Sequence, residues 1–142
     1  MGFDPAVWGP HYWFFLQTIA ESYPTHPNQV TKRKYYDLIQ NFPLFIPDDE
    51  MGNRFSECLD KYPVSPYLGT RDSFVRWVNF IHNKINVILY KPEMSLVDAL
   101  AAYRDEYKAK PVILNEQIKV KQHVVIGVFT LLCIYFVYLS FE

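Results

Sequence analysis

The sequence DSFVRWVNFIHNKINVILY, residues 72–90, predicts a long α-helix because its apolar residues recur at helical spacing. They fall three or four positions apart, which places them on one face of an α-helix and predicts that this face packs in a core. Pro92 follows and ends the helix, since proline has no N–H to donate. The apolar face consists of Phe74, Trp77, Val78, Ile81, Ile85 and Ile88.

Three more helices are predicted before this one. Pro10 can occupy the first turn of a helix over about 10–22, because proline is tolerated there. Asn28 can cap a second helix, over about 28–41, by accepting a backbone N–H with its side chain. Prolines bracket a third helix over about 47–62.

A shorter fifth helix is predicted over about 95–107. Ser95 and Asp98 have the spacing of a capping box at its start. Neither the alternation typical of strands nor an internal repeat is present in the sequence. The sequence therefore predicts an all-α domain over 1–107, an up-and-down four-helix bundle with a short fifth helix.

The C-terminal run Val124–Phe141 reads VVIGVFTLLCIYFVYLSF and carries no charge over 18 residues. As a helix it would be roughly 27 Å long, close to the thickness of a bilayer core. A buried core helix is the alternative, but the run is apolar on all sides and follows Lys119 and Lys121. We therefore expect a basic linker over 108–121 and a transmembrane anchor over 122–142. The positive-inside rule then places the N-terminal domain on the cytoplasmic side.

Charge and cysteine content exclude several classes of function. The formal net charge of the 142 residues is −1, with 14 Lys and Arg against 15 Asp and Glu, so nucleic acid is not an expected partner. Of the two cysteines, Cys58 falls in the domain and Cys133 in the apolar run, so a disulfide between them is not expected. Without a CxxC, an HExxH or a Cys/His cluster, no metal site is expected either. Cys58 is best interpreted as a small buried apolar residue.

Two motifs go beyond helix patterning. The first, WGPHYWFFLQTIA at 8–20, is followed by Tyr23 and Pro24, and the second, WVNFIHNKIN at 77–86, is followed by Lys91 and a proline. Together they resemble the Erv/ALR family of FAD-linked sulfhydryl oxidases. Members of that family have the motif W-x-x-L-H-x-x-A-x-x-Y-P early in the sequence of the domain. They have the motif W-x-x-x-x-H-N-x-V-N-x-x-L-x-K-P late in it. The resemblance covers about residues 8–107.

The resemblance implies a flavin held in the mouth of the bundle. An aromatic ring would stack on the flavin, and amides would hydrogen-bond its edges. A cation would offset the negative charge of its diphosphate. Tryptophan in a bundle is more often a core residue, whereas two asparagines inside a helix gain nothing from helix propensity. The asparagines therefore either satisfy a ligand or remain as relics of one. The resemblance assigns to this FAD site Gly9, Trp13, Gln17 (in place of the family's early histidine), His82, Asn83, Asn86 and Lys91.

The sequence departs from the family where its chemistry takes place. The family has a redox-active Pro-Cys-x-x-Cys at the start of the third helix, and here Pro47 is followed by Asp48 and, three residues later, Met51. A carboxylate has no redox couple and a thioether cannot form a disulfide. No catalytic residue is therefore predicted, and we expect no sulfhydryl oxidase reaction.

Erv-like domains without these cysteines and with a membrane anchor resemble proteins of large DNA viruses that have an internal membrane. The resemblance implies a non-catalytic minor capsid or virion-membrane protein that links the internal membrane to the capsid. Its partners would be capsid or other virion proteins, and it would sit in the virion inner membrane with its domain facing the capsid. One alternative is an FAD-linked thiol oxidase acting in viral disulfide formation. Another is a decoy that pairs with an active paralogue, and a homodimer is also expected from the family.

Overall fold

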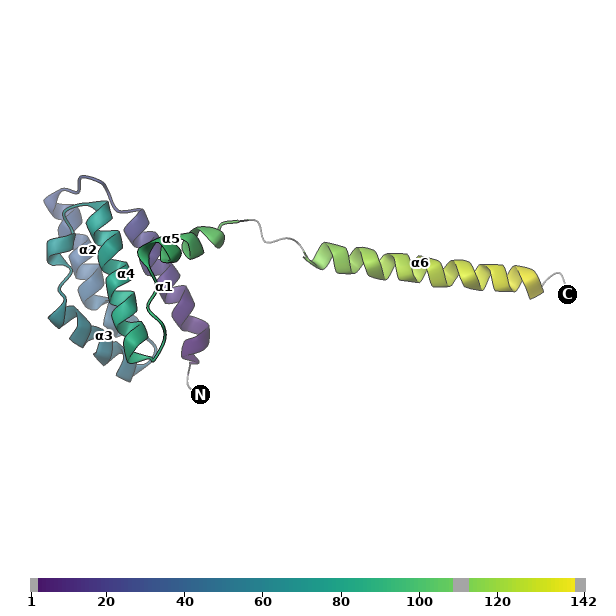
Figure 1. Cartoon of the computed structure of the whole chain (residues 1–142), viewed down its shortest axis with the longest axis horizontal. Coiled ribbons are helices and arrows are strands. Elements are labelled where there is room, and N and C mark those ends of the chain that lie inside the picture. Colours follow the sequence, from purple (N-terminus) through teal and green to yellow (C-terminus); the bar gives the residue numbers. More distant parts are fainter. Residues whose placement is uncertain (1–2, 109–112, 140–142) are drawn as a thin grey trace. The chain divides into compact units, whose positions relative to one another are not determined.

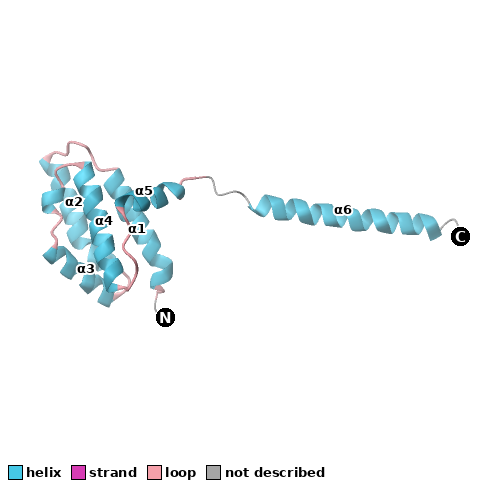
Figure 2. Ribbon diagram, viewed as in Figure 1, coloured by secondary structure: helices cyan, strands magenta, loops and turns pink. Residues whose placement is uncertain are grey.

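The computed structural model describes residues 3–108 and 113–139, all of whose regular elements are helices (Figures 1 and 2). The all-α prediction is confirmed. The chain divides into two compact units, Met1–Tyr107 and Lys108–Glu142. The elements are α1 (Pro5–Glu21), α2 (Gln29–Asn41), the 3-10 helix η1 (Phe42–Phe45), α3 (Asp49–Lys61), the 3-10 helix η2 (Ser65–Tyr67), α4 (Arg71–Ile88), α5 (Leu96–Asp105) and α6 (Ile113–Leu139).

The first helix begins earlier than predicted. Asp4 caps it by accepting the N–H of Ala6 at 2.8 Å, and Pro5 occupies its first position. Pro10, expected at the start, instead lies inside α1. An aspartate followed by proline is the stronger start signal, and it adds more than one turn to the helix. The added turn brings Pro5, Ala6, Trp8 and Gly9 to the site described below.

The other helix starts agree with the sequence. Asn28, Asp48 and Ser95 each accept the backbone N–H three residues further on, at 2.8, 2.8 and 3.1 Å. Helix α4 begins with a reciprocal pair, in which Thr70 and Ser73 each accept the other's backbone N–H. The N-terminal N–H groups that a helix leaves unpaired are thus partly satisfied at each of these starts.

Helix α4 is central to the N-terminal unit. It packs against α1, α3 and α5, while η1 packs against α2 and α3. The predicted apolar face of α4 forms its core, and the indole N–H of Trp77 donates to the carbonyl of Tyr62 at 3.1 Å. Ile88, at the end of that face, is only partly buried. The α4 residues that are at most 3% exposed are Phe74, Trp77, Val78, Ile81 and Ile85.

Tyr23 joins two connections of the bundle. It is fully buried, and its hydroxyl donates to the carbonyl of Leu68 at 2.9 Å. Its own carbonyl accepts from the guanidinium of Arg71 at the start of α4. The α1–α2 connection is thereby fixed to the segment that enters α4.

Helix α3 and η1 approach each other closely at Gly52. A Cβ atom on this glycine would lie 2.9 Å from the carbonyl oxygen of Pro43. Real Cβ atoms do not come so near a backbone oxygen, so only glycine fits without a shift of η1. This contact places the residues of η1 beside the start of α3.

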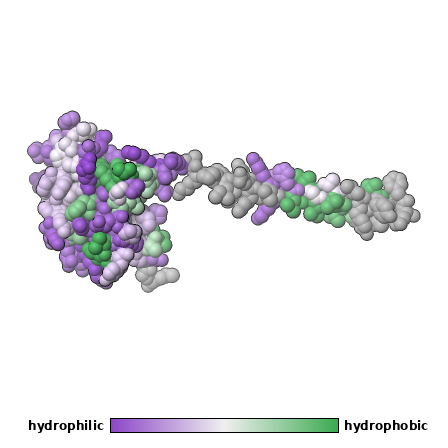
Figure 3. Space-filling model, in the orientation of Figure 1, coloured by the Kyte–Doolittle hydropathy of each residue, from purple (hydrophilic) through white to green (hydrophobic). Residues whose placement is uncertain are grey.

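The second unit contains α6, 27 residues long. Helix α6 begins at Ile113, so part of the range expected to form a linker, 108–121, is helical. Among residues 3–108 and 113–139, no helix is both long and apolar enough to span a membrane. The last residues of the predicted anchor, 140–142, lie outside the described part of the chain. In the coloured part of α6, Figure 3 shows hydrophilic side chains followed by hydrophobic ones.

Candidate functional site

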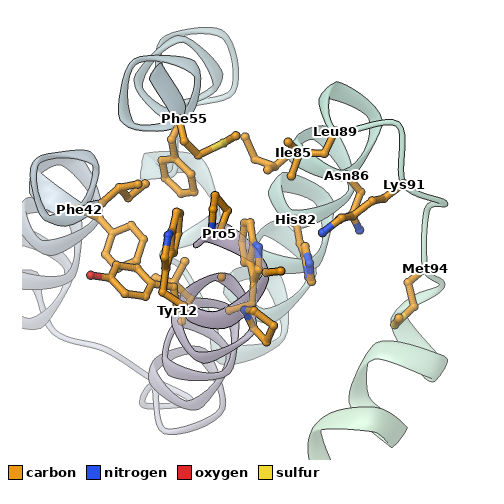
Figure 4. Close-up of a pocket in the computed structure, with 18 of the residues that line it drawn as sticks. Pro5, Tyr12, Phe42, Phe55, His82, Ile85, Asn86, Leu89, Lys91 and Met94 are labelled. Atoms are coloured by element: carbon orange, nitrogen blue, oxygen red, sulfur yellow. The ribbon is translucent and has the colours of Figure 1, made fainter. Parts of the chain in front are cut away.

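A pocket opens at one end of the N-terminal unit, between α1, η1, the start of α3 and the end of α4 (Figure 4). Its volume is about 660 Å³, a size typical of small-molecule and cofactor sites. The segment after α4 closes one side through Lys91, Pro92 and Met94. The apolar walls include Pro5, Trp8, Tyr12, Leu16, Phe42, Ile46, Phe55, Ile85 and Leu89.

Flat aromatic surfaces form much of the wall. The ring of Trp13 stacks on that of His82, with centroids 4.0 Å apart and planes 13° apart. The ring of Phe55 is tilted by 39° relative to that of Trp13, at a centroid distance of 6.1 Å. Tyr12 packs on Phe42 at 5.7 Å, and its hydroxyl donates to the backbone carbonyl at position 45. Such a wall is suited to a planar ring system.

His82 is a neutral imidazole at physiological pH. Burial is the main cause that lowers its pKa to about 4, and the nearby positive charge of Lys91 lowers it further. A neutral imidazole has one ring N–H that donates and one ring nitrogen that accepts. The stack with Trp13 therefore adds a polar edge to the pocket without adding a charge.

Asn86 shapes the mouth of the pocket with both its side chain and its backbone. The residue lines the pocket and is 8% exposed. Its carbonyl accepts the N–H of Lys91 at 2.8 Å, and the carbonyl of Val87 accepts the N–H of Tyr90 at 3.1 Å. Tyr90 takes the left-handed conformation, with φ 55°, so α4 ends in a Schellman motif. This ending places the cation of Lys91 at the pocket.

Trp8 brings a hydrogen-bond donor to the wall. It lines the pocket and packs edge-on against Tyr12, at a centroid distance of 5.2 Å. Its indole nitrogen is buried and has no hydrogen-bond partner within the described residues. An unpaired buried donor is costly, and an acceptor atom on a bound molecule would remove that cost. The wall is thus incomplete in a way that a ligand would satisfy.

The structure brings most of the predicted site residues together and leaves two outside. Gln17 is buried but does not line the pocket, and its amide donates to the carboxylate of Glu21 at 3.3 Å. Asn83 does not line the pocket either, because its amide is bound to the backbone of Met94. The predicted residues that do line it are Gly9, Trp13, His82, Asn86 and Lys91.

Several residues that line the pocket were not predicted from the sequence. Phe42 and Ile46 come from η1 and its end, and no helix was predicted there. Phe55 and Tyr12 have the spacing of ordinary core residues. A pocket wall made of apolar side chains has the same sequence pattern as a core, so periodicity alone could not separate them.

The start of α3 presents no thiol to the pocket. The carboxylate of Asp48 is used in capping, since it accepts the N–H of Met51 at 2.8 Å, and the Met51 side chain lines the pocket. Cys58 is buried away from the lining, and burial raises the pKa of its thiol above the usual value. Cys58 and Cys133 are both free. Within residues 3–108 and 113–139, no group of three or more His, Cys, Asp or Glu could hold a metal ion.

Relatives of this chain occur in large viruses. It is 28% identical over 100 residues to a protein of Acanthamoeba polyphaga mimivirus named "Probable FAD-linked sulfhydryl oxidase", and the match covers 70% of each protein. It is 27% identical over 105 residues to a protein of invertebrate iridescent virus 3 that also bears the name of an FAD-linked sulfhydryl oxidase. That match covers 73% of this chain and 70% of the relative.

Solved structures share the fold. The crystal structure of the yeast Erv1 core superposes with a TM-score of 0.66 at 24% identity, over 74% of this chain and 87% of that one. The FAD-binding domain of Erv1 from Saccharomyces cerevisiae gives the same TM-score and identity, over 72% of this chain and 96% of that one. The family model described as Erv1 / Alr matches residues 10–107. Since this match spans well over half of the chain, the protein belongs to the Erv1/Alr family.

Proposed function

We propose that this chain binds FAD in the pocket and acts as an FAD-linked sulfhydryl oxidase whose dithiol is supplied by a second protein. The observation that carries the proposal is the pocket itself. Residues far apart in the sequence meet in one aromatic-lined site of about 660 Å³, which has a cation at its mouth. The viral relatives that are named FAD-linked sulfhydryl oxidases support the same class of chemistry.

The lining residues fit FAD in shape and charge. Trp13 and His82 offer stacked faces for a planar ring, and the amide of Asn86 can hydrogen-bond a ring edge. Lys91 can offset the negative charge of a diphosphate. The unpaired indole N–H of Trp8 can donate to an acceptor atom of the cofactor. When bound, FAD would supply the two-electron redox chemistry that no side chain of this wall possesses.

The dithiol has to come from outside the pocket wall. Asp48 caps α3, and the thioether of Met51 cannot form a disulfide. The thiol of Cys58 is buried and its raised pKa keeps it protonated. The role of this chain is thus to hold the cofactor and shield one side of it, while a partner presents the two thiols.

Two measurements on the full chain test this function. The first is the visible absorption spectrum of the purified protein before and after FAD is added, and we expect the bands of bound flavin. The second is oxygen uptake with a reduced CxxC protein as the thiol donor, with free FAD as the control. A chain that stays colourless with excess FAD contradicts the proposal, and so does a flavin-loaded chain that consumes no oxygen with any dithiol.

A non-catalytic structural role is the second candidate, and the uncharged run Val124–Phe141 favours it. In this function the run anchors the chain in the internal membrane of a large DNA virus, with the N-terminal unit on the cytoplasmic side and facing the capsid. The described apolar side chains of α6, such as Phe129 and Leu131, are exposed. Exposed apolar surface of this kind is typical of a contact with lipid or protein. Co-fractionation with membranes and recovery in virus particles, without thiol oxidation, would select this candidate.

A further inference from the structure

Residues 90–95, which we call the strap, connect α4 to α5 and close one side of the pocket. Lys91, Pro92 and Met94 of the strap line the pocket. Figure 4 shows the strap running from the end of α4 past Lys91 to Met94. The strap has no regular secondary structure, so its position depends on contacts with its neighbours.

The near end of the strap is fixed by the end of α4. The carbonyl of Asn86 accepts the N–H of Lys91 at 2.8 Å, as described for the Schellman motif. This contact involves only backbone atoms. It sets where the strap starts, and it leaves the direction of the following residues open.

The far end is fixed by the side chain of Asn83. Its amide oxygen accepts the N–H of Met94 at 2.9 Å, and its amide nitrogen donates to the carbonyl of Met94 at 2.8 Å. Both backbone groups of one residue are therefore held by one side chain, which determines position and orientation together. The nearby pair of Lys84 and Glu93 is 4.0 Å apart and largely solvated, and it adds little.

We infer that Asn83 is a positioning residue of the cofactor site, which holds the Met94 half of the strap in place as a preformed wall for FAD. This inference rests on the proposed binding of FAD. It differs from the direct cofactor contact that the family resemblance implied for Asn83, since this side chain is not part of the lining. A wall that is already in place does not have to be ordered when the ligand arrives, and this raises affinity.

The test compares variants of the full chain by FAD fluorescence titration and stopped-flow dissociation. Asn83→Ala removes both bonds to Met94, and we expect the affinity to fall about tenfold, mainly through faster release. Asn83→Asp keeps an acceptor for the Met94 N–H and loses the donor to its carbonyl. The affinity of this variant for FAD should therefore lie between those of the wild type and Asn83→Ala. Asn79→Ala is the control, because it makes the same change one turn earlier in α4, at a residue whose side-chain oxygen is buried without a hydrogen-bond partner in the described part of the chain.

A double-mutant cycle separates positioning from direct contact. Met94→Ala removes the side chain that Asn83 places against the pocket. If Asn83 acts through Met94, the loss caused by Asn83→Ala should be much smaller in the Met94→Ala background. If the loss of FAD affinity in the double variant equals the product of the losses in the two single variants, the residues are not coupled. Asn83 then does not act through Met94, and the inference is overturned.

Amide exchange of the FAD-free protein reports on the strap itself. We expect the Met94 amide to exchange faster in Asn83→Ala while the core amides of α4 are unchanged. An unchanged Met94 amide overturns the inference and leaves FAD binding by the wild type standing. A wild type that binds no FAD removes the cofactor function and this inference together, and the absorption spectrum identifies that case.

Discussion

The imidazole of His82 lies flat on the indole of Trp13, with 4.0 Å between the ring centroids. The two rings join α4 to α1 in the wall of the pocket. Burial, and then the charge of Lys91, lower the pKa of His82 to about 4. The stack is therefore formed by a neutral imidazole, and protonation of His82 places a charge in a largely buried site near the cation of Lys91.

The stability of the N-terminal unit should decrease as the pH falls from about 6.5 to about 4. In the unfolded chain His82 takes up a proton near its ordinary pKa of 6.5, whereas in the folded chain it does so only near pH 4. Protons thus favour the unfolded state in this window, by up to about 3 kcal/mol. Urea unfolding at pH 7 and at pH 4.5 measures the effect. His82→Phe keeps a ring against Trp13 but cannot be protonated, so it should lose less stability between pH 7 and pH 4.5 than the wild type. An equal loss in both proteins would contradict the assignment of this pH dependence to His82.

Replacement of Tyr90 by glycine should stabilise the protein. Tyr90 has a φ of 55° and is 99% exposed, so its side chain makes little contact while its Cβ strains the backbone. Tyr90→Gly should raise the free energy of unfolding by about 1 kcal/mol. Tyr90→Ala is the control, because it removes the ring and keeps the strain. If both variants are equally stabilised, the ring and not the backbone is the source of the effect.

Gly52→Ala should destabilise the protein. The new Cβ would lie 2.9 Å from the carbonyl oxygen of Pro43, so η1 has to move away from α3. We expect a loss of about 1–3 kcal/mol in urea unfolding, as for other overpacked sites. Gly9→Ala is a matched control, since Gly9 is also helical and a Cβ there meets no atom within 4 Å. That control should gain about 0.5–1 kcal/mol from helix propensity, and a comparable loss in both variants would argue against the close approach.

A dithiol placed at the start of α3 should supply the missing thiols in the same chain. Asp48→Cys combined with Met51→Cys puts two thiols three residues apart, one of them on the pocket lining. With FAD and a small dithiol reductant, oxygen uptake should rise well above that of the wild type. Loss of the Asp48 cap should cost about 1 kcal/mol. Asp48→Ser with Met51→Cys keeps a cap and supplies one thiol, and activity equal to the double-cysteine variant would show that no disulfide is involved.

The sequence predicted the fold well because its signals were local. Asn28 and Ser95 cap helices where expected, and Asp48 caps the third helix, which was expected to start near it. Each of these caps is a bond to a residue three positions away. The start of α1 was predicted too late because Pro10 has the pattern of a first-turn proline, as do Asp4 and Pro5 at the true start. A second proline inside a helix is rare enough that a single sequence gives little warning of it.

The site was harder to predict because its decisive contacts are not local. The bond between Asn83 and Met94 spans 11 residues and includes backbone atoms, for which the sequence carries no pattern. Gln17 has the spacing of a lining residue, yet its amide donates to Glu21 one turn along α1. Motif resemblance identified the helix faces that meet at the pocket. Whether a given side chain faces the cavity or a neighbouring backbone depended on packing that only the structure shows.

The double use of Asn86 limits how this part of the chain can change over evolution. Its side chain lines the pocket while its carbonyl determines where Lys91 begins the next segment. An insertion or deletion of even one residue between them would rotate Lys91 away from the cavity or break the end of α4. Descendants of this sequence can therefore exchange side chains here, but they cannot alter the number of residues between Asn86 and Lys91 and keep the same site.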